Sequence, residues 1–92
     1  MGFEVNADWR NNGTPSPGDL VHLKLVKTWI YKIKVIVQDV TGDFVTGVVD
    51  CVFDWQTEGQ IQVSDVNELI GKTLKFHPNM IFKLIKEKDT QR

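Results

Sequence analysis

Alternation of apolar and polar residues over two neighbouring stretches constrains this chain more than any other feature of its sequence. In residues 20–25 and then in residues 29–37, apolar or aromatic residues recur at every second position. They are Val21, Leu23, Leu25, Trp29, Tyr31, Ile33, Val35 and Val37. A period of two places one set of side chains on one face of an extended chain. The sequence therefore predicts two neighbouring β-strands.

A third strand is expected over residues 44–53, which are rich in valine and phenylalanine. It follows Thr41-Gly42-Asp43, in which glycine supplies the positive φ that tight hairpin turns require. The second and third strands are therefore expected to form one long hairpin, with Gly42 and Asp43 as its two-residue turn.

The register of this hairpin depends on Asp50. In an uninterrupted ladder, Asp50 shares a face with Val35 and would be buried, which is costly for an unpaired carboxylate. An extra residue near Gly47 shifts the far half of the hairpin by one position. The bulged register is the favoured one. It turns Val49, Cys51 and Phe53 inward, and it turns Asp50 and Asp54 outward toward Lys32 and Lys34.

The rest of the chain predicts shorter elements. Phe3 and Val5 alternate with polar residues and fit a short edge strand, whereas residues 11–19 (NNGTPSPGD) read as a linker or surface turn. Asp65 and Glu68 have the spacing of a capping box ahead of Gly71, which predicts one helical turn. Residues 72–77 and 81–85 alternate again, and Pro78-Asn79-Met80 separates them.

This order of elements resembles a Src-homology-3-like (SH3-like) or Tudor-like small barrel over Gly18 to Ile85. Two segments carry the resemblance: the opening Gly18-Asp19-Leu20-Val21 and the closing GKTLKFHPNMI of residues 71–81. The resemblance implies an all-β fold, a five- or six-stranded SH3-like barrel with one short helical turn. The aromatic signature with which Src-homology-3 domains bind proline-rich peptides is absent, so that activity is not expected. The expected core comprises Leu23, Ile33, Val35, Val37, Val49, Cys51, Phe53, Leu74, Phe76 and Ile81.

Composition fits one small domain. The chain has 92 residues, of which 41% are hydrophobic and 25% charged, with a formal net charge of −1. This length supports a single core, and no run approaches the roughly 18 apolar residues of a membrane span. We expect an N-terminal arm or edge strand with its linker over residues 1–17, the barrel over 18–86 and a charged tail over 87–92.

Cys51 is the only cysteine, so an internal disulfide is excluded. The residues from Met1 to Asp19 include Glu4, Asp8 and Arg10 and lack the apolar stretch of a signal peptide. Both features favour a reducing, cytoplasmic location.

Charge is segregated along the chain. Residues 41–70 carry six acidic and no basic residues, a charge of −6. Residues 20–40 have four lysines and one aspartate (+3), and residues 71–92 have six basic and two acidic residues (+4). Pairing across adjacent strands would neutralise this pattern; otherwise it produces a dipolar surface that can steer a partner or a second copy.

Catalytic and metal-binding motifs are not evident. His22 and His77 lie 55 positions apart, outside any metal-ligand spacing, and no glycine pattern typical of a phosphate loop occurs. Cys51 with a histidine, or Asp50 with Asp54, would be needed for enzymatic chemistry, and nothing in the sequence positions either pair. We therefore expect a non-enzymatic protein without metal or cofactor.

Aromatic and acidic residues cluster at one end of the predicted hairpin. Trp29 and Tyr31 open its first strand, and Trp55 follows its second, close to Asp54 and Glu58. Ring faces together with carboxylates favour a cationic group or a peptide side chain. The expected function is therefore a binding module for a protein segment or cationic ligand; alternatively, these aromatics only close the end of the barrel.

Two other functions remain open. Small barrels often present lysines and aromatics to single-stranded nucleic acid, and here Lys24, Lys32, Lys34, Lys75 and Lys83 could form a lysine face. Self-association is the third alternative, because exposed strand edges, including the one around Phe3 and Val5, can pair with a second copy.

Overall fold

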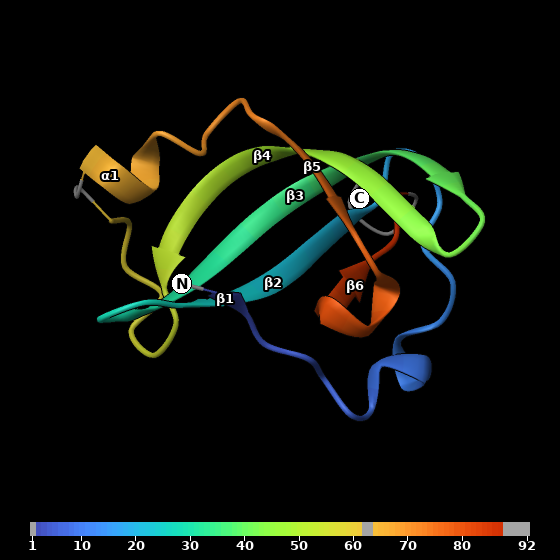
Figure 1. The fold of residues 1–92 in the computed structure, drawn as a ribbon, viewed down its shortest axis with the longest axis horizontal. Helices are drawn as coiled ribbons and strands as arrows, with labels where there is room; N and C mark the ends of the chain where they lie inside the picture. Colours follow the sequence, from blue (N-terminus) through green and yellow to red (C-terminus); the bar gives the residue numbers. More distant parts are fainter. Residues whose placement is uncertain (1, 62–63, 88–92) are drawn as a thin grey trace.

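A computed structural model describes residues 2–61 and 64–87 of the chain. Within these residues, six strands form one antiparallel sheet in the order β1-β2-β3-β4-β5, with β6 pairing on β2. Figure 1 shows the sheet curling into a half-barrel, which confirms the predicted all-β small-barrel class. The strands are β1 (Gly2–Phe3), β2 (Leu20–Val26), β3 (Ile30–Thr41), β4 (Phe44–Asp54), β5 (Thr73–Phe76) and β6 (Ile81–Ile85).

Three single turns of helix connect the strands. A 3₁₀ turn, η1 (Trp9–Asn12), precedes β2, and a second, η2 (Pro78–Met80), joins β5 to β6. The predicted helical turn is α1 (Ser64–Asn67). Gly71, at φ 86°, ends the turn that follows it, in a conformation that favours glycine. The predicted capping box depends on the side chain of Asp65, which is not among the side chains that the structure describes.

The long hairpin forms with the predicted turn. Thr41 pairs with Phe44 across Gly42 and Asp43, and Gly42 has a φ of 60°. The predicted bulge near Gly47 is also present, with its extra residue, Gln38, on the opposite strand. A Cβ on Gly47 would lie 2.5 Å from Val35 Cγ1 and 2.6 Å from the Ile36 carbonyl oxygen. Glycine is therefore required here because the two strands approach too closely for a side chain.

A second bulge, which was not predicted, occurs at Asp50. Lys34 pairs with Cys51 and Val35 pairs with Val49, so Asp50 has no partner in the ladder. This extra residue cancels the shift made by the first bulge, so the end of β4 has the same pairing as in a hairpin without bulges. Asp50 is exposed as expected, but Val52 rather than Cys51 faces inward.

The second bulge overturns three expectations. Cys51 and Phe53 are half-buried and lie outside the core cluster, and the ammonium of Lys34 lies 4.4 Å from the Phe53 ring centroid. Asp54 was expected to face outward toward Lys32 and Lys34. Instead it pairs with Tyr31 and is 8% exposed. The physical reason is the same in each case: one added residue reverses the face of every side chain that follows.

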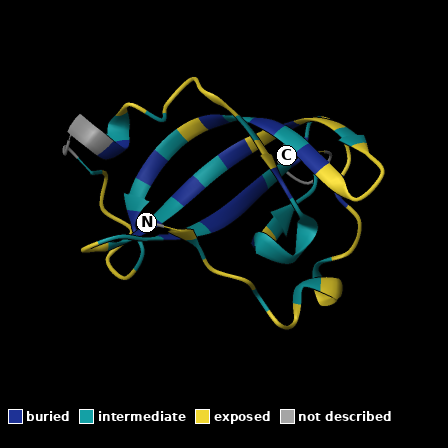
Figure 2. Ribbon diagram, viewed as in Figure 1, coloured by how far each residue is buried: buried dark blue, intermediate teal, exposed yellow. Residues whose placement is uncertain are grey.

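The core lies on the concave side of the sheet. Burial alternates along β3 and β4, whereas β2 is buried at three successive residues because His22 is buried as well (Figure 2). Seven of the ten predicted core residues are buried, and Leu74 packs against them. The buried hydrophobic residues are Val21, Leu23, Leu25, Tyr31, Ile33, Val35, Val37, Val45, Val49, Val52, Val66, Phe76 and Ile81.

The N-terminal arm is attached to the barrel. Phe3 pairs with Leu25 as the predicted edge strand, whereas Val5 lies outside it and is 59% exposed. The side-chain amides of Asn6 and Asn12 both donate to the Ile81 carbonyl, at 3.0 and 2.9 Å. Among the helices that the structure describes, none is long and apolar enough to cross a membrane.

Candidate functional site

The five predicted site residues are divided between the two faces of the hairpin. Trp29 and Asp54 come together in a pocket, and Tyr31 lies in the core beside them at 7% exposure. Trp55 and Glu58 instead contact lysines on the convex side of the sheet. Asp54 is the last residue of β4 and faces the core, whereas Trp55, the next residue, points to the opposite face of the hairpin.

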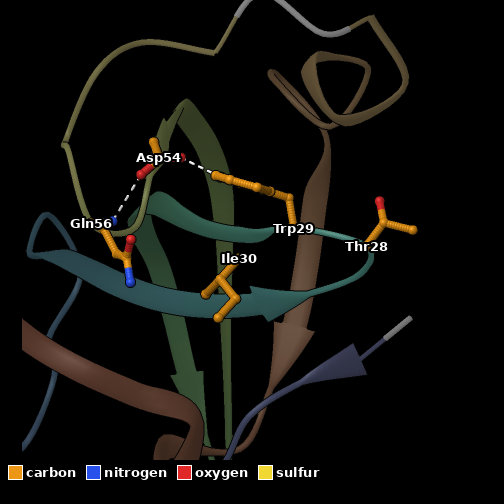
Figure 3. A pocket seen from close by; sticks show the side chains of 5 residues that line it. All are labelled: Thr28, Trp29, Ile30, Asp54 and Gln56. Atoms are coloured by element: carbon orange, nitrogen blue, oxygen red, sulfur yellow. Dashed lines mark hydrogen bonds between the residues drawn. The ribbon is translucent and has the colours of Figure 1, made fainter.

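The pocket with Trp29, called the Trp29 pocket here, has a volume of about 230 Å³ and is lined by Thr28, Trp29, Ile30, Asp54 and Gln56. Figure 3 shows the indole of Trp29 reaching from the β2–β3 turn toward Asp54 at the end of β4. Its Nε1–H donates to Asp54 Oδ2, although 57% of the residue is exposed. The ring is thus held in a fixed position while much of its surface faces solvent.

Asp54 organises the loop around this pocket. Its Oδ1 accepts from the backbone amides of Gln56 and Thr57, both at 2.9 Å. The Asp54 amide donates to the Gly59 carbonyl at 2.8 Å, and the Glu58 amide donates to the Asp54 carbonyl at 3.0 Å. An aspartate that accepts amide hydrogens two and three positions further on is typical of a tight turn, which explains why the strand ends here.

Asp54 is ionised although little of the residue is exposed. Hydrogen bonds from Thr57 and Trp29 lower the pKa of Asp54 against the opposing effect of burial, so the carboxylate is ionised at neutral pH. Within the described part of the chain, no lysine or arginine forms an ion pair with it. The Trp29 pocket therefore contains a negative charge that only neutral donors stabilise.

Sequence reasoning missed Thr28, Ile30 and Gln56 as lining residues. Gln56 could have been placed by the turn that Asp54 forms, because aspartate commonly caps such turns. Thr28 and Ile30 flank Trp29 at the β2–β3 connection and carry no signal of their own.

The convex side of β6, β2 and β3 presents a second cluster, called the outer basic face here. It consists of Lys24, Lys32, Lys34, Lys83, His22, Trp55 and Phe82. Lys24 pairs with Lys32 across the strands, and His22 pairs with Lys34 on one side and Lys83 on the other. Four of the five lysines of the predicted lysine face are thus together. Lys75 is elsewhere, on β5, 4.9 Å from the ring centroid of Phe44.

A cavity of about 310 Å³ opens on the outer basic face, lined by His22, Lys32, Trp55, Phe82 and Lys83. The rings of Trp55 and Phe82 meet edge to face with centroids 5.3 Å apart. The ammonium of Lys24 lies 5.0 Å from the Trp55 centroid. His22 and Phe82 were not predicted here. The alternation along β2 places His22 on the same face as Lys24, whereas the bulge that leaves Phe82 without a ladder partner has no sequence signal.

Cys51 does not have the environment of an activated thiol. Burial raises its pKa, and the neighbouring carboxylate of Asp50, 3.5 Å from Sγ, raises it further. A protonated thiol is a poor nucleophile. Among the residues that the structure describes, no group of three or more histidine, cysteine, aspartate or glutamate side chains could hold a metal ion.

Comparison of the chain with protein-family models, with curated proteins and with solved structures found no match.

Proposed function

We propose that the protein is a non-enzymatic binding module whose Trp29 pocket takes a cationic group, such as the lysine or arginine side chain of a protein segment. The observation that carries this proposal is the ionised carboxylate of Asp54, 8% exposed, in a pocket where no described cation pairs with it. An ionised carboxylate without a cationic partner attracts a cation, and the walls of the pocket shield this attraction from water more than an open surface would.

Trp29 supplies the second half of the recognition. An ammonium or guanidinium group is attracted to an indole face, an interaction worth about 0.5–2 kcal/mol depending on desolvation. The Nε1–H···Asp54 hydrogen bond holds the ring in place before a ligand arrives. Little side-chain entropy is then lost on binding.

The size of the pocket favours a side chain over a complete small molecule. Its volume of about 230 Å³ is below the roughly 300–1,000 Å³ of typical small-molecule sites. A single cationic side chain presented by a peptide fits this space. The lone Cys51, typical of proteins in reducing compartments, supports a cytoplasmic location for such a module.

The test is a titration with two peptides that differ only in one residue, lysine or acetyl-lysine, followed by NMR of the backbone amides. The lysine peptide is expected to shift the amides of Gln56 and Thr57 and the indole N–H of Trp29, with weaker binding at high salt. Asp54→Asn should abolish the shifts. Asp50→Asn removes the same charge from an exposed position of the same strand and should leave them unchanged.

Equal responses to both peptides, or equal losses in the two variants, would contradict the proposal. The asparagine side chain introduced by Asp54→Asn retains an oxygen that can accept from the two loop amides, so the fold of the variant can be checked by the dispersion of its amide spectrum. If Asp54→Asn unfolds the loop, Trp29→Leu provides an independent variant of the pocket.

A further inference from the structure

The outer basic face places like charges opposite one another. Lys24 and Lys32 are direct cross-strand partners, and His22 is flanked by Lys34 and Lys83. Like charges in such positions destabilise a sheet. Glu4 pairs with Lys24 at 2.9 Å, and Glu58 pairs with Lys32. Four lysines against two carboxylates leave this face with a charge of +2.

Lys34 and Lys83 lie close enough to Glu58 for its charge to act on them, but Glu58 forms its ion pair with Lys32. Within residues 2–61 and 64–87, neither ammonium forms an ion pair with an acidic side chain. Lys34 lies over the ring of Phe53, and Lys83 is exposed at the edge of the cavity. An anion in the cavity would therefore meet a positive potential from three strands and displace no existing partner of Lys83.

His22 adds a polar group to the cavity. The residue is 6% exposed, and its Nε2 is buried without a hydrogen-bond partner among the described residues. Burial and the charges of Lys34, Lys32 and Lys83, opposed by Glu58, lower its pKa to about 4, so the ring is neutral at pH 7. A buried nitrogen that lacks a partner costs free energy, which a ligand donor or acceptor that reaches it recovers.

The aromatic residues narrow the class of ligand. Trp55 and Phe82 form one wall of the cavity, with Lys32 and Lys83 close to them. A simple inorganic anion would contact the lysines alone, whereas the two rings, which already pack against the ammoniums of Lys24 and Lys32, offer apolar surface to a planar group. Aromatic side chains beside lysines are the usual means by which proteins hold a nucleobase together with its phosphate.

We infer that the cavity of the outer basic face binds a phosphorylated nucleoside, either as a free nucleotide or within a single strand. The phosphate contacts Lys83, which has no ion pair, and takes the place of Glu58 at Lys32. The base packs against Trp55 and Phe82. This site is separate from the Trp29 pocket and lies on the opposite face of the hairpin. The two sites can therefore be disrupted independently.

The experiment is a calorimetric titration of the full chain with AMP, adenosine, inorganic phosphate and a ten-nucleotide single-stranded DNA, each at two salt concentrations. AMP is expected to bind at least tenfold more tightly than adenosine or phosphate, and more weakly at high salt. A free-nucleotide site gives AMP and the oligonucleotide similar affinity. A strand-binding site gives the oligonucleotide higher affinity and a steeper salt dependence.

Variants assign the binding to this cavity. Lys83→Gln and Phe82→Leu should each weaken AMP or oligonucleotide binding by about tenfold, the scale of one stacking or phosphate contact. Lys75→Gln makes the same charge change on β5 and should have no effect. Lys83 is exposed, so its variant keeps the fold, whereas Phe82→Leu is checked by its unfolding midpoint.

Three results would overturn the inference: no heat with any of the four probes, phosphate binding as tightly as AMP, or the same loss in Lys75→Gln as in Lys83→Gln. The third result would mean that the net charge of the surface, and not the cavity, attracts the ligand. Trp29→Leu should bind AMP normally, which separates failure of this site from failure of the Trp29 pocket.

Discussion

The indole N–H of Trp29 donates a hydrogen bond to Oδ2 of Asp54, 25 positions further along the chain. This contact joins the β2–β3 turn to the loop that follows β4, two segments that the sheet alone brings near each other without fixing their side chains. It also accounts for an exposed tryptophan with a defined orientation. The same carboxylate anchors both the ring and the loop, so the shape of the Trp29 pocket depends on one side chain.

Trp29→Phe is expected to raise the pKa of Asp54, because the indole hydrogen bond is one of the interactions that lower it. Loss of this hydrogen bond should also lower the free energy of unfolding. The pKa is measured by NMR titration of the Asp54 side-chain carbon. Trp55→Phe, on the other face, should leave this pKa unchanged; an equal shift in both variants would show that Trp29 has no specific effect.

Gly47→Ala is expected to destabilise the protein by roughly 1–3 kcal/mol, the usual range for overpacking. The added Cβ would collide with Val35 Cγ1 and the Ile36 carbonyl oxygen at 2.5 and 2.6 Å. Denaturant unfolding measures the loss. Gly59→Ala is the matched control, since its nearest neighbour would be Thr57 Oγ1 at 3.4 Å. A loss as large in the control would attribute the effect to a general cost of alanine in this fold.

Asp19→Asn should reduce stability by about 1–3 kcal/mol, the cost of leaving buried donors unsatisfied. Asp19 is 3% exposed and accepts from the amides of Ser16 (2.8 Å) and Glu87 (3.0 Å) and from the Lys86 ammonium (3.1 Å). It thereby joins the linker before β2 to the segment after β6. Asp43→Asn, at the exposed hairpin turn, should change the unfolding midpoint little.

Asp19 also predicts a pH dependence. Burial alone would raise its pKa, but the hydrogen bonds from Glu87, Lys86 and Ser16 outweigh burial and lower it from the usual 3.8. Its contribution to stability is therefore present above pH 3.8 and is lost as the pH falls through the folded-state pKa. Asp19→Asn should lack this part of the acid-induced loss, measured as unfolding free energy between pH 5 and 2.

Protonation of His22 should reduce stability at a higher pH than protonation of Asp19 does. Its pKa is about 4 in the folded protein, against an ordinary value of 6.5. A depressed histidine pKa means that protonation favours the unfolded chain, so its contribution is complete above pH 6.5 and declines between pH 6.5 and 4. The decline should be about 2 kcal/mol, reduced from the full linkage value by water in the adjoining cavity.

His22→Gln should remove that decline, whatever its effect on stability at pH 7. The comparison is between the slopes of unfolding free energy against pH for the two proteins from pH 7 to 4.5. His77→Gln provides a control for the second histidine. Parallel slopes for all three proteins would contradict the low pKa of His22.

The strands, the hairpin turn and the bulge at Gly47 could be predicted from the sequence. Each has a local cause: apolar residues at every second position, a glycine that adopts positive φ, and a glycine where strands approach closely. The bulge at Asp50 has no such signal, because the bulge at Gly47 alone is enough to turn Asp50 outward and nothing in the sequence calls for a second one. Its effect nevertheless extends to Cys51, Phe53 and Asp54, all of which were assigned to the wrong face.

The candidate site was predicted in part for the same reason. Sequence proximity correctly suggested that Trp29 and Asp54 lie at one end of the hairpin, but it also included Trp55 and Glu58. Whether a side chain faces the concave or the convex side depends on the number of bulges before it. The outer basic face, which needs β6 beside β2, depends on a pairing between segments about 60 residues apart that no local pattern encodes.

The two bulges of the hairpin affect the curvature of the sheet without changing which residues form its core. Gln38 and Asp50 have no ladder partner. If either residue is left out, the buried or partly buried core residues before and after it fall at every second position of the strand. A related chain that lacked both residues would keep every core side chain in place while losing the extra twist that bulges introduce. Such a chain would have the same hydrophobic residues on a flatter sheet. Insertions and deletions at these two positions are therefore a route by which evolution or design can adjust how far the barrel closes without repacking its interior.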